Sequence, residues 1–413
     1  MILRAKLGAL VERNFRVLFT STTISALGDG VATIALAFAV LEIGSPIGLG
    51  LVLAGRQAAQ AAITLAAGVW ADRLPRHLVL LAAASVQGAA QAATGALVLS
   101  GHATVPDLVA LQIVYGLADG FVLPASQGLI PAVISAARLQ QANALLGLSR
   151  SAVGVLGPAL GGILVALGSP GSALVVDAAS FAGAAFLLAR LRLSDRREPG
   201  APQSFLAELR GGWDEFRRQT WLWTTIVFFG IGNCVFAAYF VLGPVIAKRD
   251  LGGAAAWATL GSAFGAGAIL GGLLALRIRP RRPLVVSCLA AWPIMLQPLG
   301  IALKLPVPAL AAICLVAGGG IAVHLALWFT VFQQQVPEEA RSRVSSYDAL
   351  GSFVLFPLGS ALAGPVAAAV GATTTLIGVS ALMLASEIVV IVQPSVWAIR
   401  APEPAAAAAS APA

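Results

Sequence analysis

The chain has 413 residues, of which 58% are hydrophobic and only 11% are charged, and its mean hydropathy is +0.89. Soluble proteins carry about a quarter charged residues, so a water-soluble globule of this composition would expose large apolar patches and aggregate. Composition therefore excludes a soluble protein and indicates a membrane protein. The apolar runs are continuous and not alternating, which excludes a β-barrel and predicts membrane helices.

Apolar runs separated by polar or Pro/Gly breaks predict twelve membrane-spanning helices. Each run reaches the roughly 20 residues that a membrane helix needs. The predicted spans are 15–41, 46–70, 77–100, 105–131, 139–168, 170–191, 221–247, 254–277, 283–304, 306–335, 343–370 and 372–397.

The longest hydrophilic stretch lies in the middle of the chain and divides the spans into two groups of six. Apolar residues at helical spacing in this stretch predict a short amphipathic helix on the membrane interface. The expected organisation is a cytoplasmic leader at 1–14, an N-terminal bundle at 15–191, a link at 192–220, a C-terminal bundle at 221–397 and a disordered cytoplasmic tail at 398–413.

The basic surplus follows membrane topology. With the N-terminus inside, 21 of the 26 Lys and Arg residues lie in inside segments, three lie outside, and Arg56 and Arg150 lie within spans. Positive charge marks the cytoplasmic side, so both termini are predicted to be cytoplasmic in a multi-pass plasma-membrane protein. The net charge of +8 is then a topology signal and not a nucleic-acid footprint.

An internal repeat supports two related halves. The end of span two, Gly68–Arg76, is similar to the end of span eight, Gly271–Arg281, and the Pro-Arg pairs match at an offset of 205 residues. Duplicated six-helix halves are typical of secondary carriers that bind substrate between the halves near the membrane midplane.

These residues resemble the major facilitator superfamily. The string Gly68-Val-Trp-Ala-Asp72-Arg73-Leu-Pro-Arg76 is similar to the signature between helices two and three of that family. The resemblance implies that Asp72 docks at the start of span eleven as a cytoplasmic gate, supported by Arg73 and Arg76. A charged loop that only sets topology remains the alternative. The second half has Leu276 near the position that matches Asp72.

Span five carries a second family-like motif, formed by Gly154, Gly157, Pro158, Gly161 and Gly162. It resembles the motif of antiporters, usually exporters. Small side chains along one helix face allow another backbone to approach closely, so a simple packing seam is the alternative to a seam that limits leak during export.

Shorter strings at 14–16, 124–131 and 177–181 resemble the subgroup that contains macrolide exporters and the enterobactin exporter. This resemblance implies proton-coupled efflux of a drug, an antibiotic or a siderophore. Drug exporters of the family often carry arginine in span four, where this chain has Asp119.

Charges inside spans are costly and mark functional sites. Acids outnumber arginines in the spans, and a carboxyl that alternates between protonated and charged forms carries protons. Asp29 and then Asp119 are the favoured carriers, because spans one and four line the cavity of the resembled fold. A static Asp/Arg pair is the alternative for both, and Asp177 and Glu387 are expected to be structural. The proton-coupling candidates are Asp29, Asp119, Arg150, Arg56 and His324.

Aromatic and amide side chains suit a cavity for a bulky amphipathic molecule. His324 either joins the proton path or bonds to a neighbouring backbone. The substrate-cavity candidates are Gln112, Tyr115, Asn233, Phe236, Tyr239 and Trp328.

The favoured function is therefore a secondary transporter that exports a hydrophobic or amphipathic small molecule in exchange for protons by alternating access. Uptake by the same fold is the first alternative, and a non-transporting sensor is the second. We expect a monomer without enzymatic activity, cofactor or metal, whose partners are substrate, protons and membrane lipid, and not nucleic acid.

Overall fold

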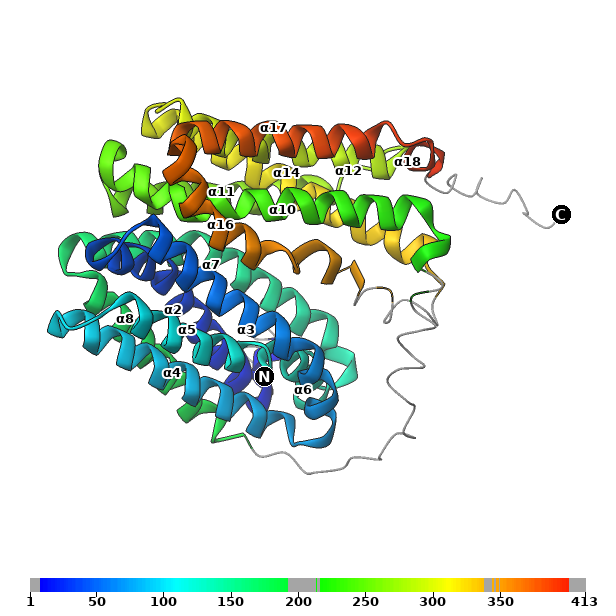
Figure 1. The fold of residues 1–413 in the computed structure, drawn as a ribbon. Helices are drawn as coiled ribbons and strands as arrows, with labels where there is room; N and C mark the ends of the chain where they lie inside the picture. Colours follow the sequence, from blue (N-terminus) through cyan, green and yellow to red (C-terminus); the bar gives the residue numbers. More distant parts are fainter. Residues whose placement is uncertain are drawn as a thin grey trace.

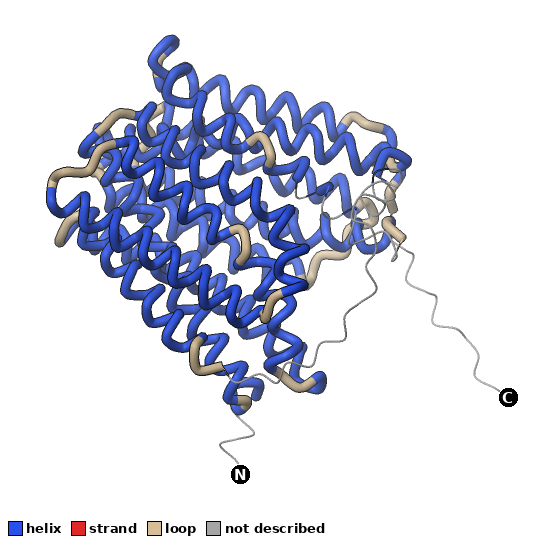
Figure 2. The backbone as a smooth tube through the Cα atoms, turned by 60° about the horizontal axis from the view of Figure 1, so that its bottom comes forward, coloured by secondary structure: helices blue, strands red, loops and turns tan. Residues whose placement is uncertain are grey.

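The computed structural model describes residues 8–191, 216–337 and 350–400, with Trp213, Val344, Tyr347 and Asp348, but not the side chains of 65–73, Gly128, Pro131 and Ala136. All regular structure in these ranges is helical (Figure 2). Most of the predicted amphipathic helix of the link lies outside the described residues, but Trp213 and Phe216 at its end are described and helical. The tail from residue 401 lies outside them as well.

Two helical bundles make up the molecule, with the N-terminal half below and the C-terminal half above in Figure 1. The N-terminal half contains α2 (Arg13–Ile43), α3 (Pro46–Arg73), α4 (Arg76–Ser100), α5 (Val105–Asp119), α6 (Val122–Val133), α7 (Leu139–Leu167) and α8 (Pro170–Leu188). The C-terminal half contains α10 (Thr220–Ile246), α11 (Ala254–Ala275), α12 (Pro283–Ala291), α13 (Leu296–Ala302), α14 (Val307–Gln335), α16 (Phe356–Val370), α17 (Ala372–Ile391) and α18 (Pro394–Ala398).

Eleven segments of the described residues are long and apolar enough to cross a membrane. Helix α3, 28 residues long, agrees with the remaining predicted span, so the all-α fold of two six-span halves is confirmed. Local capping explains several boundaries. The Thr104 hydroxyl accepts a hydrogen bond from the Asp107 backbone at the start of α5, and Ser169 does the same with Ser172 at the start of α8.

Four of the predicted continuous spans are interrupted. The fourth breaks between α5 and α6 at Gly120, where an added Cβ would lie 2.0 Å from Ile63 Cγ2, so the absence of a side chain lets α3 pass close by. The others are interrupted beside Pro293, Pro357 and Pro394, because proline lacks a backbone donor and disturbs the preceding turn. The last span therefore ends at Ile391, and the short helix α18 follows it.

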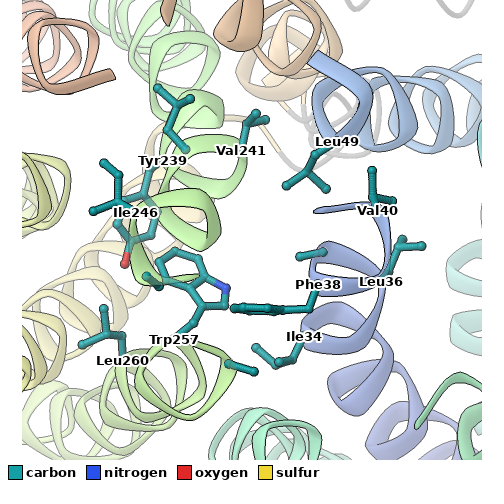
Figure 3. Close-up of a cluster of buried hydrophobic side chains, with 14 of the residues drawn as sticks. Ile34, Leu36, Phe38, Val40, Leu49, Tyr239, Val241, Ile246, Trp257 and Leu260 are labelled. Carbon is teal, nitrogen blue, oxygen red and sulfur yellow. The ribbon is translucent and has the colours of Figure 1, made fainter. Parts of the chain in front are cut away.

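One apolar cluster joins the two halves at one end of the molecule, which we call the joined end. It combines the apolar residues of the stretch 31–40 of α2 with the last turns of α10 and the first turns of α11. Figure 3 shows Trp257 of α11 pointing toward Phe38 of α2, with Tyr239 on the far side of the indole. Both Trp257 and Phe38 are buried, so this end is sealed by side chains of both halves.

At the opposite end, which we call the parted end, each half has its own apolar core. Phe15 and Leu18 belong to a cluster made only from the N-terminal half. Trp221 and Leu222 belong to another, made only from the C-terminal half. The bundles diverge toward this end in Figure 1, so the halves form a V that is closed at the joined end.

Helices α3 and α16 form one of the two largest contacts between the halves, the other being that of α7 with α11. A Cβ on Gly50 would lie 2.4 Å from the Ser360 carbonyl oxygen, and one on Gly364 would lie 2.6 Å from the Ile47 Cα. The Ser360 hydroxyl also donates a hydrogen bond to Gln57 Oε1 at 3.0 Å. Glycines on α3 and α16 thus allow the backbones of these two helices, one from each half, to lie in direct contact.

Glu12 ties the start of α2 to the connection between α6 and α7 at the parted end. Its carboxylate accepts hydrogen bonds from the Ser135 hydroxyl at 2.6 Å, the Ser135 backbone N–H at 2.9 Å and Arg138 Nη1 at 3.2 Å. These bonds, the hydroxyl bond above all, hold the pKa of Glu12 below its usual value.

A group whose pKa is depressed on folding stabilises the fold above its unfolded pKa, and this stabilisation is lost as pH falls through the folded pKa. Glu12→Gln should therefore lower the thermal unfolding midpoint of the detergent-solubilised protein at pH 7 and flatten its decline on acidification. The control is Glu42→Gln, which changes an exposed acid at the far end of α2. An acid profile identical to wild type for Glu12→Gln would contradict this assignment.

Candidate functional site

A polar network fills the interior of the N-terminal half. It consists of three bonded groups, centred on Asp29, Asp119 and Asp177, whose hydrogen bonds and one ion pair together link five helices. Its members are Asp29 of α2, Arg56 and Gln60 of α3, Gln87 and Gln91 of α4, Gln112, Tyr115 and Asp119 of α5, and Asp177 and Ser180 of α8.

Asp29 pairs with the arginine of the network. Its Oδ1 lies 3.7 Å from Arg56 Nη2, and the Tyr115 hydroxyl donates a hydrogen bond to the same oxygen. The Arg56 guanidinium lies 4.0 Å from the centroid of the Tyr115 ring, where the ring face attracts a cation. Side-chain exposure is 34% for Asp29 and 21% for Arg56, so the pair is partly buried.

Asp119 has amide partners and no ion pair within the described residues. Gln60 Nε2 donates to its Oδ2 at 2.8 Å, and Gln87 Nε2 donates to its Oδ1 at 3.3 Å. The break between α5 and α6 follows directly after Asp119, where α3 approaches Gly120 closely enough for Gln60 to reach the carboxylate. Asp119 is therefore not paired with an arginine among the described residues in this conformation.

Asp177, expected to be structural, belongs to the same network. It is fully buried and accepts hydrogen bonds from Gln91 Nε2 at 2.7 Å and the Ser180 hydroxyl at 3.3 Å. Gln112 donates to Gln91 Oε1 at 3.0 Å and so joins Asp177 to α5. An added Cβ on Gly28 would lie 2.3 Å from Asp177 Oδ1, so the glycine before Asp29 provides the room for this carboxyl.

Four donors of the network, Gln60, Gln87, Gln91 and Ser180, are not among the site residues predicted from the sequence. Gln87 and Gln91 are four residues apart and therefore lie on one face of α4. A polar pair at this spacing inside an apolar span was the available signal.

The C-terminal candidates are held by internal contacts. His324 Nδ1 lies 3.0 Å from the Ser287 hydroxyl and 3.1 Å from the Ser287 carbonyl oxygen, and the residue is buried. Trp328 donates to Asp348 at 3.1 Å, and Asn233 donates to the Ser352 carbonyl at 2.9 Å. In this conformation His324 thus has the neighbouring-residue bond that sequence analysis left as its alternative role.

The aromatic cavity candidates lie in packed surroundings. Phe236 and Tyr239 are stacked with ring centroids 5.2 Å apart, and both belong to the apolar cluster of the joined end. Gln112 and Tyr115 are fully buried in the network. All four residues are buried.

The glycines of α7 pack against both halves. A Cβ on Gly157 would lie 2.8 Å from Gly30 Cα of α2, and one on Gly161 would lie 2.9 Å from the Val31 carbonyl oxygen. On the side of α11, a Cβ on Gly162 would lie 2.4 Å from Ala258 Cβ.

Two further positions extend the contact with α11. A Cβ on Gly265 would lie 2.3 Å from the Gly154 carbonyl oxygen, and one on Gly261 would lie 3.1 Å from Pro158 Cβ. The stripe predicted from sequence is therefore a close-packing seam, and it places α7 between its own half and the other half.

The gate motif falls mostly outside the described side chains. Helix α3 ends at Arg73, and the side chains of Gly68, Asp72 and Arg73 are not among those described. Arg76 is the first residue of α4. Docking of Asp72 at the start of span eleven stays a prediction.

A cavity of about 260 Å³ lies between α6 and α7. It is lined by Gln127, Ile130, Leu139, Asn143 and Arg150. Arg150 is exposed and forms no ion pair within the described residues, so it lies apart from the Asp29 pair.

Two six-span halves, the first of which holds a charged polar network in its interior, have the architecture of a multi-pass membrane transporter of small molecules. Residues 18–360 match the Major Facilitator Superfamily, and the chain belongs to this family. The nucleoside transporter NupG has the same fold, with a TM-score of 0.71 at 13% identity over 91% of this chain and 98% of that one. A bacterial homologue of the human lysosomal transporter Spinster, inward-facing and unoccupied, gives a TM-score of 0.71 at 15% identity over 94% and 98%.

Curated relatives cover nearly the whole chain. The multidrug efflux pump Tap of Mycobacterium tuberculosis is 25% identical over 402 residues, which cover 92% of this chain and 93% of the relative. The enterobactin exporter EntS of Citrobacter koseri is 28% identical over 402 residues, covering 91% and 92%.

The contact between Gly265 and Gly154 predicts that a methyl group added at Gly265 lowers stability, whereas one added at an uncovered glycine of the same helix does not. Gly265→Ala should destabilise the protein by about 1–3 kcal/mol, the usual cost of overpacking, because the methyl would meet the α7 backbone. Gly272→Ala on the same helix is the matched control, since a Cβ there meets nothing within 4 Å. Thermal unfolding in detergent measures both; equal midpoints for the two variants would contradict close packing at Gly265.

Proposed function

We propose that the protein exports a hydrophobic or amphipathic small molecule from the cytoplasm in exchange for protons. The observation that carries this proposal is the buried network, which holds the three carboxyls of Asp29, Asp119 and Asp177 but the single guanidinium of Arg56. Burying three negative charges against one positive charge is too costly. Some of these carboxyls therefore hold protons while buried and release them when water reaches the network.

Asp29 is the proposed point of exchange. It is partly exposed and lies beside Gly30, which packs directly on Gly157 of the α7 seam. A change in how α7 packs between α2 and α11 alters the surroundings of Asp29 and Arg56 together. Asp119 and Asp177 lie in the same half, each held by glutamine amides in a separate bonded group, and they supply further places for a proton.

The proposed direction rests on charge placement and on the relatives. Basic residues concentrate on the side of the N-terminus, so we place both termini in the cytoplasm of a plasma-membrane protein. The parted end then faces the cytoplasm, the side from which an exporter takes its substrate. Relatives named as a multidrug efflux pump and an enterobactin exporter favour an amphipathic drug or siderophore as cargo and favour transport over enzymatic activity.

Direction and coupling can be measured together in everted membrane vesicles. An interior-acid pH gradient should drive accumulation of the cargo, tested with a panel of amphipathic antibiotics and a catecholate siderophore. Collapse of the gradient with nigericin should release it. Accumulation that requires the opposite gradient would identify an uptake carrier and contradict the proposal.

Removing the charge of Asp29 tests the site. Asp29→Asn should reduce gradient-driven transport to background, because an amide cannot exchange a proton. The amide still accepts from Tyr115 but loses the ion pair with Arg56, so we also expect a moderate fall in the unfolding midpoint. Asp177→Asn should shift the pH dependence of transport, since it removes a second proton site from the network.

Glu42→Gln is the matched control, because it replaces an exposed acid on the same helix by its amide. Transport by Asp29→Asn at the rate of Glu42→Gln would show that the Asp29–Arg56 pair only ties helices together.

A further inference from the structure

The face of α7 that carries Gly154, Gly157 and Gly161 packs against α2 and α11 near the joined end. The same face continues toward the parted end, where no neighbouring helix covers Gly147. A Cβ on Gly154 or Gly157 would meet α11 or α2, but a Cβ on Gly147 would meet nothing within 4 Å. Arg150 lies between them on this face. At about 100° per residue, it is rotated about 40° from Gly154 and about 20° from Gly157. Arg150 therefore lies on the same face of α7 as these glycines, beyond their contacts with α2 and α11.

Arg150 is the charged member of the cavity between α6 and α7. Two amide side chains, Gln127 and Asn143, line the same cavity of about 260 Å³, beside the apolar side chains of Ile130 and Leu139. No acid lines it, and the described residues give Arg150 no ionic partner, whereas Arg56 has Asp29. The cavity thus presents a guanidinium and two amides with no negative charge to balance them.

This donor set matches one chemical class of ligand. A guanidinium binds carboxylate, sulfonate or phosphate oxygens through two parallel N–H donors, and amide groups add further donors. The adjoining apolar side chains suit a hydrophobic ring next to the anionic group. The volume accommodates an anionic head and one ring system, so the rest of a larger molecule would extend into the space between the halves.

We propose that Arg150, with Asn143 and Gln127, binds the anionic group of an amphipathic cargo as it enters from the parted end. The proposal rests on the transport function above and narrows its substrate class to hydrophobic anions. Proton coupling stays with the Asp29 network, and Arg150 recognises cargo. An anionic lipid headgroup shares this chemistry and is distinguished by the experiment.

The test is equilibrium binding to purified protein in nanodiscs, without a pH gradient. The probe is anilinonaphthalene sulfonate, and its uncharged counterpart is phenylnaphthylamine, which has the same ring scaffold. In zwitterionic nanodiscs, Arg150→Gln should weaken saturable binding of the sulfonate roughly tenfold, since charge-assisted hydrogen bonds are lost. Binding of the neutral probe should stay within about twofold. Arg150→Lys should lie between wild type and Arg150→Gln, because it keeps the charge and loses the planar fork.

Arg190→Gln is the control, because Arg190 is an exposed arginine whose guanidinium lies over Phe186 at the end of α8; it should bind both probes like wild type. Equal losses of the charged and neutral probes in Arg150→Gln, or equal affinities of wild type and Arg150→Gln for the sulfonate, would overturn the proposal. The lipid alternative is tested by adding phosphatidylglycerol to the nanodisc that holds the protein. If this lipid strongly reduces sulfonate binding to wild type but not to Arg150→Gln, the site binds lipid and the role in cargo recognition is overturned.

Because binding is measured without a gradient, it separates the two proposals. Loss of selective sulfonate binding with intact proton-driven accumulation in vesicles would refute only the Arg150 site. Selective binding without proton-driven transport would refute only the antiport mechanism.

Discussion

Burying charged side chains in an apolar membrane is unfavourable in free energy, and the N-terminal half is arranged so that each buried acid has a hydrogen-bonding or ionic partner. Arg56 forms an ion pair with Asp29, whereas Asp119 and Asp177 accept hydrogen bonds from glutamine amides of α3 and α4. Amides stabilise a carboxylate through hydrogen bonds but do not neutralise it. The network is therefore well bonded and still short of positive charge, which is the condition under which a buried acid takes up a proton.

Glycine links this network to the relative placement of the halves. Gly28 makes room for Asp177, and Gly30, two residues later on α2, lies against Gly157 of α7. Helix α7 in turn contacts α11 of the other half through Gly154 and Gly162. A rearrangement at the α7–α11 contact is thus transmitted through backbone packing to the helix that carries Asp29, with no flexible side chain in between.

Much of the fold followed from hydropathy, because a membrane helix needs only a long apolar run. The predicted ends of the spans lie within a few residues of α2, α7 and α14. The interruptions did not follow: the break at Gly120 depends on how closely α3 passes, and close approach is a tertiary property. The same limit explains Asp177. Its charge was visible in the sequence, but its place beside Gln91 and Gly28 depends on how α8 packs against α4 and α2.

Arg56 and Arg150, the two arginines within predicted spans, have the same side chain but different surroundings. Arg56 lies under the Tyr115 ring, 3.7 Å from an acid, so its charge is already used inside the N-terminal half. Arg150 lies on the uncovered part of the α7 stripe with amides around it and no acid. One guanidinium balances part of the negative charge inside the N-terminal half, and the other lines the cavity between α6 and α7. If the two proposals hold, this separation places proton exchange and cargo recognition at different sites, the first on α2, which packs against α7, and the second on α7 itself.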